Sequence, residues 1–306
     1  MNKLKYSEMF YSLQGEGRYV GVPSLFLRLF GCNFECRGFG QERDRSTWIP
    51  HDKMPHMIQE DPHVKLFEDL PVPWVGCDSS FSWGKKWGHL ASNDDIDTLV
   101  KKMDMDMVKW YGDKEHKFTD YAYKISPCTL QNDAVHLVIT GGEPLLKGFQ
   151  PALRELINHP EVLTRFVTFE TNGTQIFAPD NSPDYIRKFG VNKNSGVTWS
   201  VSPKLSNSGE KWSEAIRPEA LASYNAWPYS YLYLKFAVRG EEDMKEVHEA
   251  VREYDHARVN IDAIYLMPET GPHGMYDYEV AQLAMKWGYK YSPRLQINLF
   301  GNEWGT

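Results

Sequence analysis

The sequence has few cysteines and lacks any long apolar segment. Only 4 of its 306 residues are cysteine, and they are unevenly spaced. So few cysteines in a chain of this length do not suggest a disulfide framework, so we expect a reducing, cytoplasmic setting. No uninterrupted apolar run approaches the length that spans a membrane, and residues 1–5 are polar, unlike a signal peptide. We therefore expect no association with a membrane.

The chain also lacks an excess of positive charge. Its formal net charge is −7, and it contains no long basic run. Proteins that bind a nucleic-acid backbone need cations to face the phosphates, so nucleic acid is not an expected direct partner. The hydrophobic content of 42% is enough for one large core, or for one domain that carries an insertion. We find no internal repeat and no low-complexity segment.

Two of the four cysteines lie close together at the end of a predicted strand. The apolar run Leu25–Phe30 leads into Gly31 and then into Cys32 and Cys36. Thiolates are the soft ligands of iron–sulfur clusters and of zinc, and a strand end is a rigid platform for such a group. On the spacing alone, a pair of ordinary reduced thiols is an equally good interpretation.

From residue 134 onward, apolar runs alternate with amphipathic segments. The predicted strands are Val135–Thr140, Phe166–Glu170, Thr198–Ser202, Tyr231–Val238, Ala263–Met267 and Leu295–Phe300. The predicted helices are Ala152–Asn158, Glu241–Tyr254 and Tyr276–Trp287, with an earlier helix over Asn93–Trp110. This alternation predicts βα units and a parallel sheet, in which ligands bind at the carboxyl edge.

Polar and glycine residues follow several of these strands. Gly141-Gly142-Glu143-Pro144 comes directly after the strand over Val135–Thr140. The glycines let the backbone approach a ligand, and the carboxylate of Glu143 can hold an ammonium group. A simple strand-to-helix turn explains the glycines alone, but it explains them poorly once the cysteine pair is considered as well.

The region between Arg37 and Gly76 has no sustained helical or strand period. It is rich in proline, aspartate, arginine and histidine. A long loop of this kind inside a compact domain is usually functional or an insertion, so we expect an insertion that covers the cysteine loop. Its histidines, His51, His56 and His63, fit solvated side chains better than metal ligands.

Taken together, these segments resemble the radical S-adenosylmethionine (radical SAM) superfamily and, more closely, the 7-carboxy-7-deazaguanine synthase family. The resemblance covers nearly the whole chain, in the family's order. The segments that carry it are Ser12–Gly17, Phe26–Asn33, Cys77–Ser79, Thr140–Pro144, Glu170–Gly173, Ser202–Lys204 and Ser292–Gln296. Each segment is a weak signal alone, but seven in order are specific.

The chain departs from the family at the third cysteine. The usual signature is CxxxCxxC, yet position 39 is Phe39. Cys77 is the better candidate for the third cluster ligand because Asp78-Ser79 matches the residues that follow the last cluster cysteine in relatives. Cys128 has no matching context, so we interpret it as structural.

The resemblance implies a fold and a set of cofactors. The fold would be a single radical SAM domain over residues 1–306, an incomplete TIM-like (β/α)6 barrel, with residues 37–76 inserted in the cluster-binding loop. Cys32, Cys36 and Cys77 would hold a [4Fe–4S] cluster that cleaves SAM to a 5′-deoxyadenosyl radical, and Ser79 would bind Mg²⁺. The family converts 6-carboxy-5,6,7,8-tetrahydropterin to 7-carboxy-7-deazaguanine with loss of ammonia. It is usually a homodimer that needs an external reductant such as flavodoxin.

The resemblance also implies two sets of binding residues. Those on the substrate side are Gln14, Glu16, Arg28 and Thr140, and those on the SAM side are Gly141, Gly142, Glu143, Glu170, Asn172, Ser202 and Lys204. Arg28 stands out without the family, because a charge inside an apolar strand is costly to bury unless it is paired. The substrate carboxylate is one partner for it. An internal ion pair with Glu16 or another acid is the alternative.

Two other functions fit part of these observations. Another radical SAM enzyme, such as a glycyl-radical activase, would share the cysteines and the GGEP segment. A catalytically inactive cluster- or zinc-binding regulatory protein would explain the displaced third cysteine. Neither explains the substrate-side segments.

Overall fold

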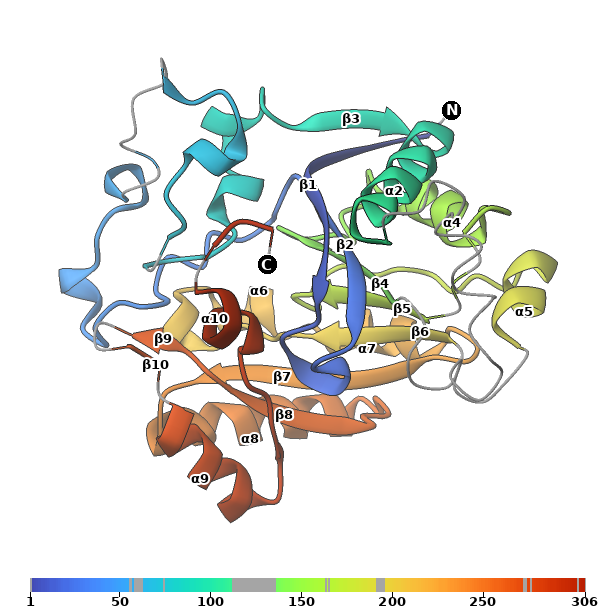
Figure 1. Ribbon diagram of the computed structural model, residues 1–306. Coiled ribbons are helices and arrows are strands. Elements are labelled where there is room, and N and C mark those ends of the chain that lie inside the picture. The colour runs from blue at the N-terminus through green and yellow to red at the C-terminus, as the bar shows by residue number, and fades with distance from the viewer. Residues whose placement is uncertain are drawn as a thin grey trace.

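A nine-stranded mixed sheet organises the chain in the computed structural model. The structure describes residues 2–54, 57, 63–73, 75–111, 136–162, 164, 166–190, 196–271, 274–275, 277–301 and 303–305. The strand order is β11-β8-β7-β6-β5-β4-β2-β1-β3 (Figure 1). The parallel strands are β2 (Pro23–Leu29), β4 (His136–Gly141), β5 (Phe166–Thr171), β6 (Gly196–Val201), β7 (Tyr231–Val238), β8 (Ala263–Pro268) and β11 (Lys290–Tyr291). The predicted α/β class is confirmed.

Two antiparallel strands extend this sheet, and the sequence analysis did not predict either. β1 (Lys3–Leu13) pairs with β2, and β3 (Ser92–Asp95) pairs with β1. A short separate hairpin is formed by β9 (Thr270–Gly271) and β10 (Gly274–Met275). The sheet is therefore mostly, but not wholly, parallel.

Helices cover one face of the sheet. They are α2 (Ile96–Tyr111), α4 (Gln150–Asn158), α5 (Pro183–Phe189), α7 (Pro218–Asn225), α8 (Glu241–His256) and α9 (Asp277–Trp287), and each contributes buried apolar residues to one large core. Two shorter helices, α6 (Trp212–Ala215) and α10 (Leu295–Phe300), complete the fold. Within the described ranges, no helix has both the length and the apolar character that crossing a membrane requires.

The strands present apolar side chains to this core and polar side chains to the other face. In β2, Leu27 and Leu29 belong to the core, and Arg28 between them lines a cavity on the opposite face. In β7, Leu234 and Phe236 belong to the core, and Lys235 lines the cavity. Because side chains alternate along a strand, adjacent strands place their polar residues side by side. The register supports this arrangement, since Arg28 pairs with Thr140, and Glu170 with Ser200.

The predicted last strand, Leu295–Phe300, is wrong. These residues form the helix α10, and the edge strand of the sheet is β11. Short apolar runs do not distinguish a strand from a helix. Here the backbone N–H of Leu295 donates to the carbonyl of Gly15 at 3.0 Å, so the segment turns onto the N-terminal loop instead of pairing at the sheet edge.

The predicted start of the first long helix is also wrong. Asn93 to Asp95 lie in β3, and α2 begins at Ile96. The carboxylate of Asp95 accepts hydrogen bonds from the backbone N–H and the hydroxyl of Thr98, so Asp95 caps the helix that the sequence placed at Asn93. Val135, Tyr276, Cys128 and the side chains of Met107 and Trp110 lie outside the described residues.

The described part of residues 37–76 includes short 3-10 turns at Arg45–Thr47, His51–Lys53 and Phe67–Asp69. It has its own small core, in which Val64, Phe67 and Leu70 pack with Phe81 and Trp87. The indole N–H of Trp304 donates to the carbonyl of Leu70 at 2.9 Å, and its ring lies 4.1 Å from that of Phe81. The end of the chain thus helps to hold this segment in place. In Figure 1 the segment lies opposite α2, α4 and α5.

We predict that Trp304→Ala loosens this small core. Loss of the ring contacts and of one hydrogen bond should cost roughly 1–3 kcal/mol of stability locally. Trypsin should therefore cleave after the exposed Lys65 faster than in the wild type. Trp287→Ala, at a partly exposed site on α9, is the matched control. Equal cleavage rates in wild type and Trp304→Ala would contradict the contact's role.

Candidate active site

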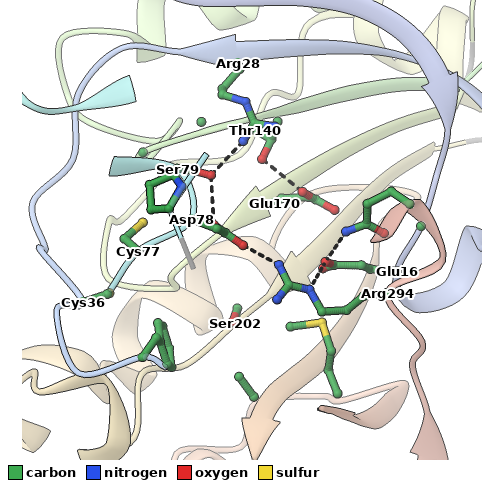
Figure 2. Close-up of a pocket in the computed structure, with 18 of the residues that line it drawn as sticks. Glu16, Arg28, Cys36, Cys77, Asp78, Ser79, Thr140, Glu170, Ser202 and Arg294 are labelled. Carbon is green, nitrogen blue, oxygen red and sulfur yellow. Dashed lines mark hydrogen bonds and ion pairs between the residues drawn. The ribbon is translucent and has the colours of Figure 1, made fainter. Parts of the chain in front are cut away.

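A cavity of about 270 Å³ lies on the polar face of the sheet. Its walls come from β1, from the parallel strands β2 and β4 to β8, from the cysteine loop, and from residues on both sides of α10. Residues of the 37–76 segment, including Phe39, Gly40 and Val72, line it as well. The expectation that this segment covers the cysteine loop agrees with these contacts. Figure 2 shows the polar side chains that point into the cavity.

The three predicted cluster cysteines line this cavity together. Cys32, Cys36 and Cys77 carry free thiols and lie in one apolar cluster around Phe34. Burial raises the pKa of the Cys32 thiol to about 12 and that of Cys77 to about 11, and it also raises the pKa of Cys36. Three thiols at one cavity wall, with Cys36 buried and Cys32 and Cys77 partly buried, suit a group that replaces their protons. Within the described ranges, no three His, Cys, Asp or Glu side chains gather as ligands of a single metal ion.

A direct contact closes the long loop between Cys36 and Cys77. The backbone N–H of Gly76 donates to the carbonyl of Phe39 at 2.6 Å. The two ends of the 37–76 segment therefore lie close together, and Cys77 packs in the same apolar cluster as Cys32 and Cys36. This contact explains how a third cysteine can be far away in sequence and still complete the group.

Glu210 supports the cysteine loop, and the sequence analysis missed it. Its carboxylate accepts hydrogen bonds from the backbone N–H groups of Glu35 (3.0 Å) and Cys36 (2.7 Å). Cys36 has a positive φ of 47°, which is rare for a residue other than glycine. Glu210 follows a turn with no recognisable motif, so nothing in the sequence identified this contact.

The two glycines after β4 are required by close packing against the cysteine strand. A Cβ atom at Gly142 would lie 2.1 Å from the carbonyl oxygen of Gly31 and 2.8 Å from the Cβ of Cys32. At Gly141, whose φ is +131°, it would lie 2.3 Å from the carbonyl oxygen of Leu29. The backbone after β4 can approach the cysteine loop only because both residues are glycine.

We predict that Gly142→Ala displaces the cysteine loop. The backbone clash should cost roughly 1–3 kcal/mol of stability and should reduce the iron that the protein retains after reconstitution. Thermal unfolding and iron analysis measure the two effects. Gly148→Ala is the matched control, because a Cβ there meets nothing within 4 Å. A Gly142→Ala protein with wild-type stability and iron content would refute this packing argument.

A hydrogen-bond network joins the residues of the predicted substrate side. The amide of Gln14 donates to Glu170 at 3.1 Å and accepts from the backbone N–H of Glu16. The hydroxyl of Thr140 donates to the other oxygen of Glu170 at 3.0 Å. Glu170, which the family resemblance assigns to the SAM side, is therefore in contact with residues of the substrate side.

Lys235 lies at the centre of this network, and the sequence analysis missed it. Its ammonium group is 2.5 Å from Glu16 and 4.0 Å from Glu170, and the residue is buried. The signal was present in the sequence, since Lys235 interrupts an apolar strand in the same way as Arg28 does. A buried cation in a strand indicates buried acids opposite it.

Arg28 has an acidic partner within the protein. Its Nε donates to Glu8 at 2.6 Å, and its Nη1 donates to the hydroxyl of Ser79 at 2.8 Å. Arg28 therefore forms an internal ion pair, as the alternative interpretation of the sequence expected, and its acidic partner is Glu8 and not Glu16. Arg28 still lines the cavity, as do Phe10 and Phe81, whose rings lie 5.9 Å and 5.6 Å from its guanidinium carbon. Its position allows it to bind an anion there.

Arg294 continues the chain of contacts from Arg28 to Glu16. Ser79 donates to Asp78 at 3.1 Å, Asp78 pairs with Arg294, and Arg294 lies 3.4 Å from Glu16 (Figure 2). Lys235 and Arg294 outweigh the desolvation of Glu16 and lower its pKa to about 2. The last part of the chain thereby links the loop that carries Cys77 to the loop that carries Glu16.

Comparison with known proteins relates the whole chain to one family. No family model matches it. It is 29% identical to a 7-carboxy-7-deazaguanine synthase of Halobacterium salinarum, over 98% of this chain and 91% of that protein. It is 25% identical to the enzyme of that name from Rhodopirellula baltica, over 100% and 90%. A solved structure described as QueE from Escherichia coli covers 95% of this chain and 93% of its own, at 20% identity and a TM-score of 0.46.

The chain is similar over nearly its whole length to proteins named 7-carboxy-7-deazaguanine synthase. This confirms the resemblance drawn from the seven sequence segments. The family is one of radical SAM enzymes, which carry an iron–sulfur cluster and use SAM.

In this chain, the cavity brings together all but one of the predicted site residues. Those that line it are Gln14, Glu16, Arg28, Cys32, Cys36, Cys77, Ser79, Thr140, Gly141, Gly142, Glu170, Asn172, Ser202 and Lys204. At its carboxyl edge, Lys204 donates to Ser202 at 3.1 Å, and Asn172 donates to Asn33 at 3.0 Å.

Glu143 is the exception, because it is fully buried behind the glycines. One carboxylate oxygen accepts from the backbone N–H of Leu145 (2.9 Å) and the hydroxyl of Thr171 (2.7 Å), and the other from the backbone N–H of Asn172 (2.7 Å). Burial raises its pKa. In this conformation Glu143 joins the segments after β4 and β5, and its contact with SAM stays a prediction.

Proposed function

We propose that this chain converts 6-carboxy-5,6,7,8-tetrahydropterin to 7-carboxy-7-deazaguanine with loss of ammonia. The observation that carries the proposal is a single cavity with two chemically different ends. Cys32, Cys36 and Cys77 lie at one wall, and the polar row that contains Arg28 and Glu16 lies on the sheet face. A cluster-binding protein without catalysis has no need of the second end.

We propose Cys32, Cys36 and Cys77 as the ligands of a [4Fe–4S] cluster. Their free thiols on one cavity wall fit such a group, because thiolates at separate corners of a cluster need not converge on one ion. When bound, the cluster supplies the electron for reductive cleavage of SAM. The backbone at Gly141 and Gly142, together with Asn172, Ser202 and Lys204, would hold SAM beside it.

We propose that the polar row binds and orients the pterin. Arg28 would hold the substrate carboxylate, with Ser79 and a Mg²⁺ ion beside it, since hydroxyl and carboxylate oxygens suit that hard cation. Glu16 would accept from the amine and amide N–H groups of the ring edge, and the Gln14 amide could both donate to this edge and accept from it. Thr140 would complete the wall. Phe10, Phe26 and Phe81 give the cavity an apolar lining that excludes water from a flat ring.

The fold and assembly extend this proposal. Parallel strands in sequential order, helices on one face and the cavity on the other support an incomplete (β/α)6 barrel formed by one domain. Residues 37–76 would be an insertion in its cluster-binding loop. A homodimer and an external reductant such as flavodoxin complete the proposal.

The test is an anaerobic reaction of the reconstituted protein with reductant, SAM, Mg²⁺ and 6-carboxytetrahydropterin. Chromatography should detect 5′-deoxyadenosine and 7-carboxy-7-deazaguanine, and formation of the deazapurine should depend on the pterin's carboxylate. SAM cleavage without a deazapurine would reject this substrate in favour of another radical SAM reaction. A reconstituted cluster without SAM cleavage would favour the regulatory alternative.

A further inference from the structure

Lys235 is a buried cation shared by two carboxylates. The residue is 4% exposed, and its ammonium group lies 2.5 Å from Glu16 Oε2 and 4.0 Å from Glu170 Oε1. Burying an ammonium group is costly unless it is paired, and the short contact with Glu16 supplies the pairing. The proposed function gives Glu16 a role on the substrate but gives none to Lys235.

Apart from Lys235, the carboxylates of Glu16 and Glu170 contact neutral hydrogen-bond donors and one cation, Arg294, which Glu16 shares with Asp78. The other oxygen of Glu16 accepts from the amide of Gln296 at 2.9 Å, and Glu170 accepts from Gln14 and Thr140. Arg294 lies 3.4 Å from Glu16, but it also pairs with Asp78. Arg294 therefore cannot neutralise Glu16 alone, and Lys235 is the cation that both Glu16 and Glu170 face.

We propose that Lys235 is a positioning residue that keeps Glu16 ionised beside Glu170, so that this end of the cavity selects a ligand edge made of N–H donors. The inference rests on the proposed function, since the amino-pyrimidinone ring of a pterin has such an edge. Two carboxylates close together without a cation hold a proton between them. A protonated carboxyl group is itself a donor, and it would meet the donors of the ring.

Lys235 is the nearest of the cations that favour the ionised form of Glu16. The other charged and titratable groups around Glu16, Glu170 and Lys235 are Tyr233 on β7, Arg28 on β2, Arg294 before α10, and Asp78 after Cys77. Glu16 and Glu170 raise the pKa of Lys235, so its charge persists at neutral pH. Removing the charge of Lys235 takes away the cation nearest to Glu16, which raises the pKa of Glu16.

The test measures pterin binding as a function of pH in Lys235→Met. The anaerobic, cluster-loaded protein is titrated with 6-carboxytetrahydropterin in the absence of SAM, so that no turnover occurs. The ratio of the variant and wild-type Kd values cancels the ligand's own titration. We expect this ratio to be roughly 10–100 at about pH 6 and to fall toward unity as the pH rises to about 8. Lys235→Arg, which keeps the charge, should give a ratio independent of pH.

Lys245→Met, on the exposed face of α8, is the matched control and should leave the Kd unchanged. If Lys235→Met does not fold by circular dichroism, Lys235→Gln replaces it with the same expected pH dependence. A ratio near unity at every pH, or a large ratio that does not change with pH, overturns the role of Lys235. Wild-type protein that fails to bind the pterin overturns the proposed function and this inference together.

Discussion

Replacing Cys77 with alanine is expected to abolish the iron–sulfur cluster. Two thiolates at Cys32 and Cys36 would remain, and a [4Fe–4S] group held by only two protein ligands is lost or degraded. After anaerobic reconstitution, the variant should lack the visible absorbance of the wild type and most of its iron. SAM cleavage should disappear with the cluster. The hydrogen bond between Gly76 and Phe39, which brings Cys77 back to the first two cysteines, is the structural reason for this expectation.

The matched control is Cys128→Ala, which removes the fourth cysteine of the chain. It should retain wild-type iron, absorbance and SAM cleavage, because the three cysteines of the cavity are intact. The opposite pattern, with the cluster lost in Cys128→Ala and kept in Cys77→Ala, would contradict the ligand assignment.

Arg28→Ala is expected to weaken pterin binding while leaving the cluster in place. Loss of a charge-assisted contact with the substrate carboxylate should raise KM by roughly 100-fold. SAM cleavage in the absence of the pterin should be unchanged. Removing the partner of Glu8 should also reduce stability by about 1–3 kcal/mol, because a buried carboxylate is left unpaired.

Arg187→Ala is the control for this substitution, since it removes an arginine from an exposed ion pair on α5. Such surface pairs contribute little, so both KM and stability should match the wild type. Steady-state kinetics and thermal unfolding separate the two effects of Arg28→Ala. Simultaneous loss of the cluster and of the folded state would mean that Arg28 serves the structure and not the substrate.

The sequence predicted the parts of the fold that depend on local pattern. Strong apolar runs such as Tyr231–Val238 were predicted with the correct bounds. The helix predicted over Glu241–Tyr254 is α8, on which Met244, Val247 and Tyr254 are buried in the core and Val251 is partly buried against it. The failures came where a distant partner decides the conformation. β1 and β3 depend on pairing across the chain, and α10 depends on its contact with Gly15.

The candidate site could likewise be predicted from the sequence only in part. Motif residues that follow strands could be assigned to one edge, because parallel strands bring their carboxyl ends together. The partners of those residues could not be assigned, because they come from unrelated segments. Glu210 beneath the cysteine loop and Glu8 beside Arg28 carry no motif. Lys235 is different, since a lysine between Leu234 and Phe236 in an apolar strand is a signal that can be read in advance.

The most direct test of the whole account is an anaerobic crystal structure of the reconstituted protein with SAM and 6-carboxytetrahydropterin, measured with X-rays at the iron edge. The account predicts anomalous iron density bounded by Cys32, Cys36 and Cys77. It also predicts a pterin whose carboxylate meets Arg28 and whose amine edge meets Glu16. Iron bound through Cys128, or a pterin outside this cavity, would contradict it.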